Sequence, residues 1–302
     1  MPGTPQTLQV PPPVSVQTIL YNTYLQIISG GNTPFVGPLD ALIAQGATFL
    51  YAGSSQRLLT SYTGNACRLQ GNGTGSPEAD IGFLSNGDID LAAAAAIAAQ
   101  DGGTAAFGVT WYDQLGVRNA TQATAASRMP FSTALNAQGG WGNGVASQSW
   151  FNLNLGTLPF PFYVSAVVKT VTAAATTRHI LGTSATSTNR WMRTNSGAMA
   201  QSWGTSMTGT ALEVSDGLHV LGFLSNGASS KHFLDGSLLL TADSGGTSDN
   251  MVGGRIGAVS AGSSAYLNTA GNAILEMVIF AADPTGLAGW SAFQAGQLSR
   301  FS

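Results

Sequence analysis

The sequence predicts a mainly β protein, a sandwich or a barrel, and three observations support this prediction. After residue 131 the chain consists of short apolar segments separated by turns rich in Gly, Asn and Ser. Glycine is abundant, at 39 of 302 residues, which suits short strands joined by tight turns. Only a few short stretches favour a helix. Many short strands at this spacing are typical of sandwiches and barrels.

The expected strands of the C-terminal half can be read directly from the chain. They are FYVSAVVKTV, RHILGT, RWMRTN, LHVLGFLSNG, KHFLDGSLLL, GGRIGAV and NAILEMVIFAAD. Within HFLDGSLL, the pair Asp235 and Gly236 predicts a two-residue hairpin turn, because Asp-Gly is favoured in such turns.

The preceding segment mixes helix and strand signals. PLDALIAQGATFLYAGSSQRLLTSYTG predicts a short helix, a turn and then a strand around Leu58 to Tyr62. IDLAAAAAIAAQDGG predicts a helix on propensity, with Asp88 or Asp90 as a cap near its start and glycines just beyond its end.

Two further elements complete the expected fold. AFGVTWYD alternates, which predicts a half-buried strand with Phe107, Val109 and Trp111 on one face. DPTGLAGWSAFQAGQLSRF predicts a final helix, with Asp283 as a possible cap and Pro284 in the first turn.

Composition excludes several classes of function. Charged residues make up 8% of the chain, the net charge is −3, and the eleven Lys and Arg are scattered. Broad binding to nucleic acid needs clustered cations, so we expect no nucleic-acid partner. A surface with so few charges is unusual for a free monomer, so we expect a homo-oligomer.

The cysteine count, the first residues and the most apolar run indicate where the chain is made. Cys67 is the one cysteine, which excludes an intrachain disulfide. The first residues show no secretory signal, and the most apolar run, DLAAAAAIAAQ, is too short to span a bilayer. We therefore expect a chain made in a bacterial cytoplasm, without insertion into a membrane.

Residues 1–38 form a separate segment. Pro2, Pro5 and Pro11 to Pro13 favour extended, polyproline-like backbone. We expect an N-terminal arm over residues 1–38 that docks on a partner or on a neighbouring copy, followed by one β-sandwich over residues 39–302.

Two acidic residues are candidate catalysts. Glycoside hydrolysis needs two carboxyl groups about 5–9.5 Å apart. The candidates are Glu276, between AIL and MVIF, and Asp113, at the end of a strand. Side chains alternate between the two faces of a strand, and this allows Glu276 to point into the core and pair with an arginine. Because the sequence places no second carboxylate where it would be expected to face the same bond, we predict no catalytic pair.

Histidines give no further catalytic prediction. His179, His219 and His232 lie in strand-like segments, and the chain has no G-x-S-x-G elbow. We therefore expect all three to be structural.

One acidic stretch raises the question of a metal. SNGDID places Asn86, Asp88 and Asp90 at alternate positions, as in part of a calcium loop, but it lacks the distal glutamate. A turn followed by a helix cap accounts for the same residues. We expect no metal and no cofactor.

Tryptophans in Gly-, Asn- and Ser-rich loops offer a different site. Trp141, Trp150, Trp191 and Trp203 could form a platform on which sugars stack. The alternative for each is packing in the core.

Asp113 also suits a structural role. An aspartate beside a turn can accept backbone N–H groups and pair with Arg118 or Arg57. Together with Asp80, these residues are expected to form a structural clasp.

The stretch around this clasp resembles a known family. GSSQRLLTSYTGNACRLQ, EADIGFLSNGDIDLAAAAAIAAQ and VTWYDQLGVRNATQ are similar to the N-terminal half of the fungal-type α-L-arabinofuranosidase B catalytic domain and to bacteriophage proteins that share this module. The resemblance covers about a third of the chain. The matching positions are Arg57, Leu59, Tyr62, Gly64, Asp80, Gly82, Tyr112, Asp113, Gln114, Gly116, Asn119 and Gln122.

The C-terminal third resembles laminin-G-like domains. There a D-G hairpin, an "iG" strand and a G-x-i-x-E-v-i-i strand precede a closing helix, and this chain has the same order. Together the two resemblances imply a concanavalin A-like jelly-roll β-sandwich with a few short helices and an extended N-terminal arm.

The departures from the family decide the expected function. The fungal enzymes carry a catalytic glutamate in a cysteine-flanked stretch, whereas residues 132–210 here contain neither Asp nor Glu. The phage relatives therefore imply a non-enzymatic virion protein, in a head decoration, a head fibre or the tail. It would dock on other virion proteins through residues 1–38 and contact host-surface glycan. The alternatives are an arabinofuranosidase-like glycoside hydrolase and a free carbohydrate-binding protein.

Overall fold

The computed structural model describes residues 35–142, 149–171, 177–183, 190–195, 197–203, 205–209, 214–246, 249–250, 254–259, 263–265 and 271–302. The chain divides after Phe35 into two units, and every element below belongs to the second, Val36–Ser302. The arm expected over residues 1–38 falls almost entirely outside the described residues, so its docking role stays a prediction.

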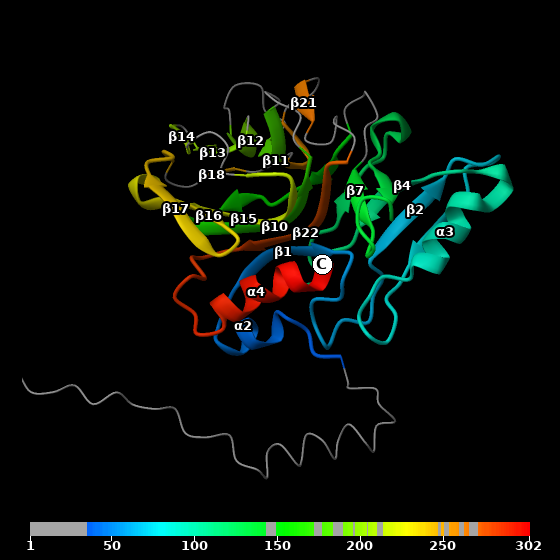
Figure 1. Cartoon of the computed structure of the whole chain (residues 1–302), viewed down its shortest axis with the longest axis horizontal. Coiled ribbons are helices and arrows are strands. Elements are labelled where there is room, and N and C mark those ends of the chain that lie inside the picture. The colour runs from blue at the N-terminus through cyan, green and yellow to red at the C-terminus, as the bar shows by residue number, and fades with distance from the viewer. Residues whose placement is uncertain are drawn as a thin grey trace, which may run out of the picture. The chain divides into compact units, whose positions relative to one another are not determined.

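The described residues are mainly β, as predicted, and Figure 1 shows their arrangement. The strands are β1 (Phe49–Ser54), β2 (Cys67–Gly71), β3 (Glu78–Ile81), β4 (Ala106–Trp111), β5 (Ala120–Thr121), β6 (Pro130–Ser132), β7 (Gly140–Gly142), β8 (Phe151–Leu153), β9 (Thr157–Leu158), β10 (Phe162–Thr170), β11 (Thr177–Thr183), β12 (Arg190–Asn195), β13 (Ala198–Trp203), β14 (Ser206–Thr208), β15 (Gly217–Ser225), β16 (Ser230–Leu234), β17 (Ser237–Ala242), β18 (Asp249–Asn250), β19 (Gly254–Ile256), β20 (Ala258–Val259), β21 (Ser263–Ala265) and β22 (Ala273–Phe280). The helices are α2 (Asp40–Ala44), α3 (Leu91–Ala99) and α4 (Trp290–Phe301), with 3₁₀ turns at η1 (Gln100–Gly102), η2 (Ala125–Ser127) and η3 (Gly227–Ser229). None of the helices in the described ranges is long and apolar enough to cross a bilayer.

Two antiparallel layers make up the sandwich. The first runs β17–β16–β15–β10–β22–β1. The second runs β3–β2–β4–β5–β8–β19–β11–β12–β13–β14. Strands β6 and β7 join the layers, because β6 pairs with β4 while β7 pairs with both β6 and β22. The antiparallel sheet is therefore nearly closed.

The central strands of the first layer, β10 and β22, are covered on both of their faces. Val164 and Val168 of β10 lie in the large apolar core between the layers. Tyr163, on the opposite face, packs with Trp290 and Phe293 of α4. Figure 1 shows α4 and α2 on this outer side of β1, β10 and β22. Burial on both faces explains why these strands are nearly continuous apolar runs rather than alternating ones.

The prediction of a strand around Leu58 to Tyr62 is wrong. The strand of this region is β1, and Leu58 lies in a loop that is buried without being part of a ladder. Its N–H donates to the side-chain Oε1 of Gln114 at 2.6 Å, and its carbonyl accepts from the N–H of Leu39 at 3.0 Å. Side-chain and loop partners thus satisfy the backbone that a neighbouring strand would otherwise pair with.

The predicted start of α3 agrees with the structure, whereas the predicted start of α4 does not. The prediction of a capped α3 is confirmed, since Asp90 Oδ1 accepts the N–H of Ala93 at 2.9 Å. The expected cap at Asp283 is wrong for α4, which begins at Trp290. The Asp283 carboxylate accepts the N–H of Thr285 at 2.9 Å and closes a turn ahead of the helix.

Strand β4 departs from regular alternation. Trp111 points into the core with 1% of its surface exposed, as predicted. The register with β2 shifts between Arg68 and Leu69, so that Val109 has no partner of its own. Such a bulge changes the face that preceding side chains occupy, and Phe107 and Val109 are half-buried.

Candidate active site

The hairpin of β2 and β3 separates apolar from polar side chains. Along β2, Cys67 and Leu69 are buried, whereas Arg68 and Gln70 lie on the other face. Successive side chains of a strand point to opposite faces, so the alternation divides the hairpin cleanly. Leu69 shares the core with Ile97 of α3, so the helix covers the apolar face. On the polar face, the side chains of Arg68, Glu78 and Asp80 keep 28–41% of their surface exposed.

The pairing register gathers four polar residues on this open face. Asp80 lies opposite Arg68, and Glu78 lies opposite Gln70. Side chains that are directly opposite in an antiparallel pair are close enough to interact. The turn between the strands therefore brings two carboxylates, a guanidinium and an amide together.

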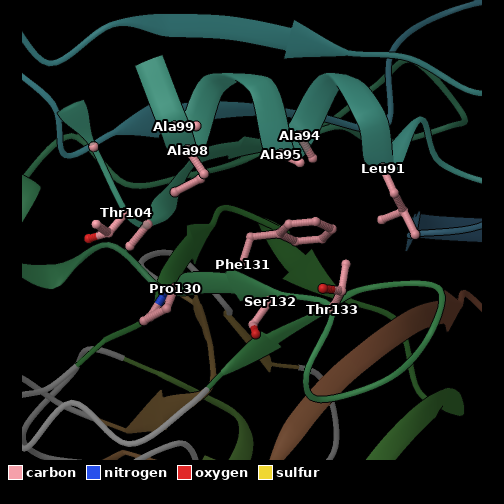
Figure 2. Close-up of a pocket in the computed structure, with 13 residues that line it drawn as sticks. Leu91, Ala94, Ala95, Ala98, Ala99, Thr104, Pro130, Phe131, Ser132 and Thr133 are labelled. Carbon is pink, nitrogen blue, oxygen red and sulfur yellow. The ribbon is translucent and has the colours of Figure 1, made fainter. Parts of the chain in front are cut away.

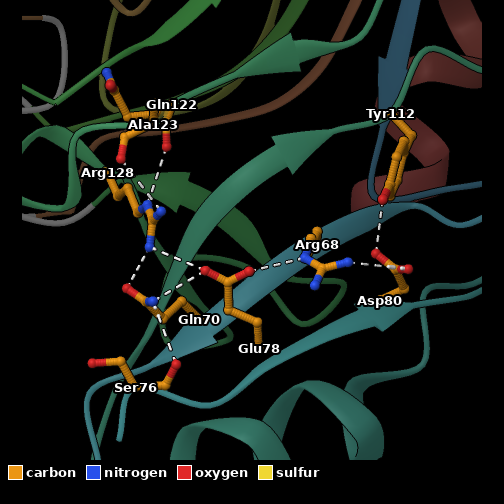
Figure 3. A network of polar contacts seen from close by, with 9 residues as sticks. All are labelled: Arg68, Gln70, Ser76, Glu78, Asp80, Tyr112, Gln122, Ala123 and Arg128. Carbon is orange, nitrogen blue, oxygen red and sulfur yellow. Dashed lines mark hydrogen bonds and ion pairs between the residues drawn. The ribbon is translucent and has the colours of Figure 1, made fainter.

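Arg68 lies between the two carboxylates, as Figure 3 shows. Its Nε is 3.0 Å from Glu78 Oε2, and its terminal nitrogen is 3.7 Å from Asp80 Oδ2. The side chains of Glu78 and Asp80 are 28% and 38% exposed, so both carboxylates can meet a ligand from solvent. Two residues along an antiparallel strand span about 6.8 Å, which is roughly the separation of the Cα atoms of Glu78 and Asp80.

Glu78 also contacts a second arginine. Arg128, just before β6, is 3.6 Å from Glu78 Oε1, and Gln70 donates to the same oxygen at 3.1 Å. The Arg128 side chain is only 9% exposed, and its Nε donates to the carbonyl of Gln122 at 3.1 Å. Figure 3 shows these groups in a row that continues through Arg68 to Asp80.

Tyr112 completes the network at the Asp80 end. Its hydroxyl donates to Asp80 Oδ1 at 2.7 Å from a position just beyond the end of β4. Burial, together with the hydrogen bond to Asp80, raises the pKa of Tyr112 to about 12. The phenol therefore keeps its proton, and remains a donor, through the neutral and mildly alkaline range.

This arrangement has the elements of acid–base chemistry on a sugar. Two carboxyl groups at a spacing of about 6.5–9.5 Å leave room for a water molecule in inverting glycoside hydrolysis. Guanidinium, amide and phenol groups supply hydrogen bonds to hydroxyls. We call Arg68, Glu78, Asp80, Tyr112 and Arg128 the carboxylate row.

A groove of about 460 Å³ lies elsewhere, between α3 and β6. Figure 2 shows Phe131 beneath Ala94 and Ala95 of the helix. Its lining consists of Leu91, Ala94, Ala95, Ala98, Ala99, Gly103, Thr104, Ala105, Ala106, Pro130, Phe131, Ser132 and Thr133, without a titratable side chain. The groove therefore offers shape but no acid or base.

Glu276, the first carboxylate considered from sequence, is fully buried. Both of its oxygens accept from Arg300 at 2.8 Å, and Ser54 and Gln297 donate to it at 3.0 and 2.9 Å. This carboxylate lies between β22 and α4, enclosed by its partners, and no substrate can reach it.

Asp113 is likewise enclosed, with 1% of its surface exposed. It accepts the backbone N–H groups of Ala52, Leu115, Val117 and Arg118 at 2.9–3.2 Å. This carboxylate fastens the loop after β4 to β1.

Of the other residues expected in the clasp, Arg118 contacts the Asp113 carboxylate through its backbone N–H, while its guanidinium is directed elsewhere. The guanidinium of Arg118 donates to the carbonyl of Leu50, and that of Arg57 donates to the carbonyl of Ser85, each at 3.4 Å. Asp80 belongs to the carboxylate row. The structure therefore brings Asp113 and Arg118 together through the backbone of Arg118 and places Asp80 in a different network.

The acidic stretch considered for calcium forms a turn. Asn86 Nδ2 donates to Asp88 Oδ2 at 2.5 Å, and Gln56 donates to Asp88 Oδ1 at 2.7 Å. Asp90 caps α3. Among the residues that the structure describes, no three His, Cys, Asp or Glu side chains gather as metal ligands.

The four tryptophans do not form a platform. Trp141 and Trp203 are 1% and 2% exposed and pack in the core between the layers. Trp191, at 6% exposed, is covered by the guanidinium of Arg193. Trp150 is half-buried beneath Arg255. Stacking on a sugar requires a free ring face, which Trp141 and Trp203 lack.

Sequence reasoning missed most of the carboxylate row. It named Asp80 as part of the clasp and Tyr112 as a family position, but not Glu78, Arg68 or Arg128. A signal existed: both CRLQG and EADI alternate polar with apolar residues, and a turn-rich segment separates them. Reading them as a hairpin would have placed the charges on one face.

Comparisons with known proteins give likeness of fold alone. No family model matches the chain, and no curated protein matches it. A GH54 α-L-arabinofuranosidase soaked with a cyclic sulfate inhibitor matches with a TM-score of 0.59 at 16% identity. A glutamate-to-glutamine mutant of a GH54 α-L-arabinofuranosidase, soaked with 4-nitrophenyl α-L-arabinofuranoside, matches with 0.57 at 14%. An arabinofuranosidase complexed with arabinofuranosyl-α-1,2-xylobiose matches with 0.54 at 14%.

These matches cover 86% of this chain but only 64–65% of the neighbours, so the chain spans less than two thirds of their length. They correct the expectation of a non-enzymatic virion protein: the three matching structures are glycoside hydrolases, which favours the hydrolase alternative, and they give no support to a phage origin. The expected homo-oligomer and its virion location stay predictions.

Proposed function

We propose that this chain is a glycoside hydrolase and that Glu78 and Asp80 are its two catalytic carboxyl groups. The observation that carries the proposal is their position on one open sheet face, two residues apart on β3 and bridged by Arg68. The fold shared with arabinofuranosidases supports the reaction class. We further infer that the sandwich is of the concanavalin A-like jelly-roll type.

The substrate class follows from the same neighbours. Two of them hold arabinofuranosyl ligands, one a 4-nitrophenyl α-L-arabinofuranoside and the other an arabinofuranosyl-α-1,2-xylobiose. Arg68, Glu78 and Asp80 are partly exposed to solvent, which suits a side-chain sugar on a polysaccharide better than the inside of a long chain. We assign arabinofuranosyl side chains as the substrate.

The contacts of the two carboxylates assign their roles. Glu78 contacts two guanidinium groups, which suits the anionic carboxylate that activates water. Asp80 is the more exposed and contacts one guanidinium rather than two, so we assign it as the group that transfers a proton to the leaving oxygen. The phenol of Tyr112 then stabilises the negative charge that develops on Asp80 as the proton leaves. Because Arg68 lies between the two carboxylates and keeps them out of direct contact, we infer that a water molecule acts between them and that the anomeric carbon is inverted.

Release of 4-nitrophenol from 4-nitrophenyl α-L-arabinofuranoside tests the proposal. Glu78→Gln and Asp80→Asn should each lower kcat/KM by about 10²–10⁴, the range expected when a general acid or base is removed. Asp101→Asn is the matched control, because Asp101 is an exposed aspartate outside the row. Thermal unfolding should be unchanged in all three variants, since surface substitutions have small effects.

Two outcomes would overturn the proposal. One is activity that survives in both Glu78→Gln and Asp80→Asn while the proteins stay folded. The other is a wild-type chain that binds arabinosylated xylan, measured by calorimetry, but releases no sugar from it. The second result would leave carbohydrate recognition at this face without hydrolysis.

A further inference from the structure

The turn between β16 and β17 is built by Asp235 and Gly236, as predicted from sequence. Their φ angles are +50° and +84°. A tight two-residue hairpin of type I′ needs positive φ at both positions, which Asp and Gly tolerate better than most residues. The turn therefore fixes the backbone of Asp235 beside β15.

Two hydrogen bonds fasten Asp235 to β15. Its N–H donates to the carbonyl of Val220 at 2.9 Å, and its Oδ1 accepts the N–H of Val220 at 2.8 Å. Because Oδ1 is held in this way, the second oxygen, Oδ2, is directed along the strand toward His219.

His219 lies between Asp235 and a serine. Its Nδ1 is 2.9 Å from Asp235 Oδ2, and its Nε2 is 3.3 Å from Ser215 Oγ. In the tautomer that fits both contacts, Nδ1–H donates to the carboxylate and Nε2 accepts the serine hydroxyl. These are the contacts of a serine nucleophile, a histidine base and an orienting aspartate.

The serine lies at an anchored and open position. The Thr170 hydroxyl donates to the carbonyls of Ser215 and Gly217, which fixes the chain at the start of β15. Ser215 is exposed, whereas the His219 side chain is 12% exposed. Gly217 has φ +131°, and a Cβ added there would lie 4.0 Å from His219 Nε2. Glycine thus keeps a side chain away from the reactive nitrogen.

We propose that Ser215, His219 and Asp235 form a second hydrolytic site, which cleaves O-acyl esters. Ser215 Oγ attacks the ester carbonyl carbon while its proton passes to His219 Nε2. The bond to the alkoxy oxygen breaks, and the alcohol leaves with that proton. Water then attacks the acyl-serine and gives a proton to His219, and Ser215 regains it as the carboxylic acid leaves. Asp235 is a positioning residue that holds the imidazole.

The substrate class follows from exposure. None of the three residues lines the groove of Figure 2, and Ser215 opens directly to solvent. Such a site suits a small acyl group that projects from a larger molecule rather than a long acyl chain that must be enclosed. We assign acetyl-type esters of exposed hydroxyls, and the use of sugar esters among them rests on the proposed glycosidase function.

The imidazole environment agrees with this role. The hydrogen bond to Asp235 raises the pKa of His219, although burial partly opposes the shift. Asp235 is the charged group in contact with the ring. A base whose protonated form is stabilised by a carboxylate is better able to accept the serine proton.

Hydrolysis of 4-nitrophenyl acetate and labelling by a fluorophosphonate test the site in the full chain. The probe should phosphonylate Ser215, identified by peptide mapping, as its phosphorus–fluorine bond breaks. Ser215→Ala and His219→Gln should lower the enzyme-dependent rate by about 10² or more. Ser299→Ala, which removes an exposed serine on α4, should change neither readout.

Asp235→Asn tests positioning separately from folding. Asparagine tolerates positive φ and can still accept the Val220 N–H, so the turn should persist. The rate should fall, and the apparent pKa of the pH–rate profile should move down because the carboxylate no longer raises the pKa of His219. A change in thermal stability alone, with the profile unmoved, would mean a structural role.

The glycosidase and esterase proposals can fail independently. Ser215→Ala should retain release of 4-nitrophenol from the arabinofuranoside, and Glu78→Gln should retain hydrolysis of the acetate. Labelling at another residue, or an ester rate equal in wild type and Ser215→Ala, would overturn the second site whatever the outcome for the first.

Discussion

The hydroxyl of Tyr112, just beyond the end of β4, donates a hydrogen bond to Asp80 Oδ1 in β3 at 2.7 Å. The contact ties the proposed acid to a phenol that stays protonated, because the pKa of Tyr112 is raised to about 12. A neutral donor on one oxygen leaves the other oxygen of Asp80 to face Arg68 and solvent.

Tyr112→Phe should therefore lower kcat/KM on the arabinofuranoside about tenfold, since a hydrogen bond to a charged group contributes about 1.5 kcal/mol. Tyr62→Phe is the control, because the Tyr62 hydroxyl donates to the carbonyl of Asn65 outside the row. Equal rates in the two variants would show that the contact does not support catalysis.

His179 should make folding stability depend on pH. Burial first, and then the charge of Arg193, lower the pKa of His179 to about 4. The unfolded chain takes up this proton at about 6.5, so stability is full above pH 6.5 and falls as the pH drops toward 4, by about 3 kcal/mol.

Urea unfolding between pH 4 and 7 measures this dependence, and His179→Gln should flatten it in that window. If the wild type and the variant lose stability in parallel as the pH falls, His179 does not supply the dependence.

The buried pair of Glu276 and Arg300 should matter for stability alone. Arg300→Met removes the cation and leaves a buried carboxylate uncompensated, which should cost about 3–5 kcal/mol. Glu276→Gln should cost less, because Gln297 and Ser54 still have a polar partner. Chemical denaturation gives the two values.

Activity per folded molecule provides the second readout for this pair. It should be unchanged in Glu276→Gln, and a loss of sugar release without loss of stability would instead place Glu276 in catalysis.

Asp113→Ala should destabilise the fold strongly. Four backbone N–H groups lose their acceptor, and Asp113 is 1% exposed, so water replaces little of what is lost. Each hydrogen bond to a charged group contributes about 1.5–3 kcal/mol, and the loss should exceed about 3 kcal/mol in urea unfolding. A cost under about 1 kcal/mol would show that the loop after β4 does not depend on Asp113.

Local chemistry was enough to predict several elements from sequence. Asp90 caps α3 and Asp235-Gly236 turns a hairpin because each effect depends on residues within a few positions. The β-bulges, in contrast, could not be predicted from the sequence. In β22, an extra residue at Leu275 lets Ile274 face the core between the layers while Glu276 faces α4, whereas a regular strand would place both on one face.

The two sites depend on contacts between distant segments. Arg68 meets Glu78 and Asp80 only through the register of β2 with β3. Ser215 and His219 are close in sequence, but Asp235 reaches them because β16 pairs with β15 and the turn folds back. The alternation of CRLQG and EADI is a sequence signal for the first register, whereas no sequence pattern indicates the pairing of β15 with β16, so His219 was expected to be structural.

Proton NMR of arabinofuranoside hydrolysis tests the central claim most directly, because it detects the released sugar and its anomeric form together. Wild-type protein should release arabinose first as the inverted anomer, and the double variant Glu78→Gln/Asp80→Asn should release none above background. Release of sugar by the double variant at the wild-type rate, or no release by the wild type, would contradict the assignment of Glu78 and Asp80 as a hydrolytic pair.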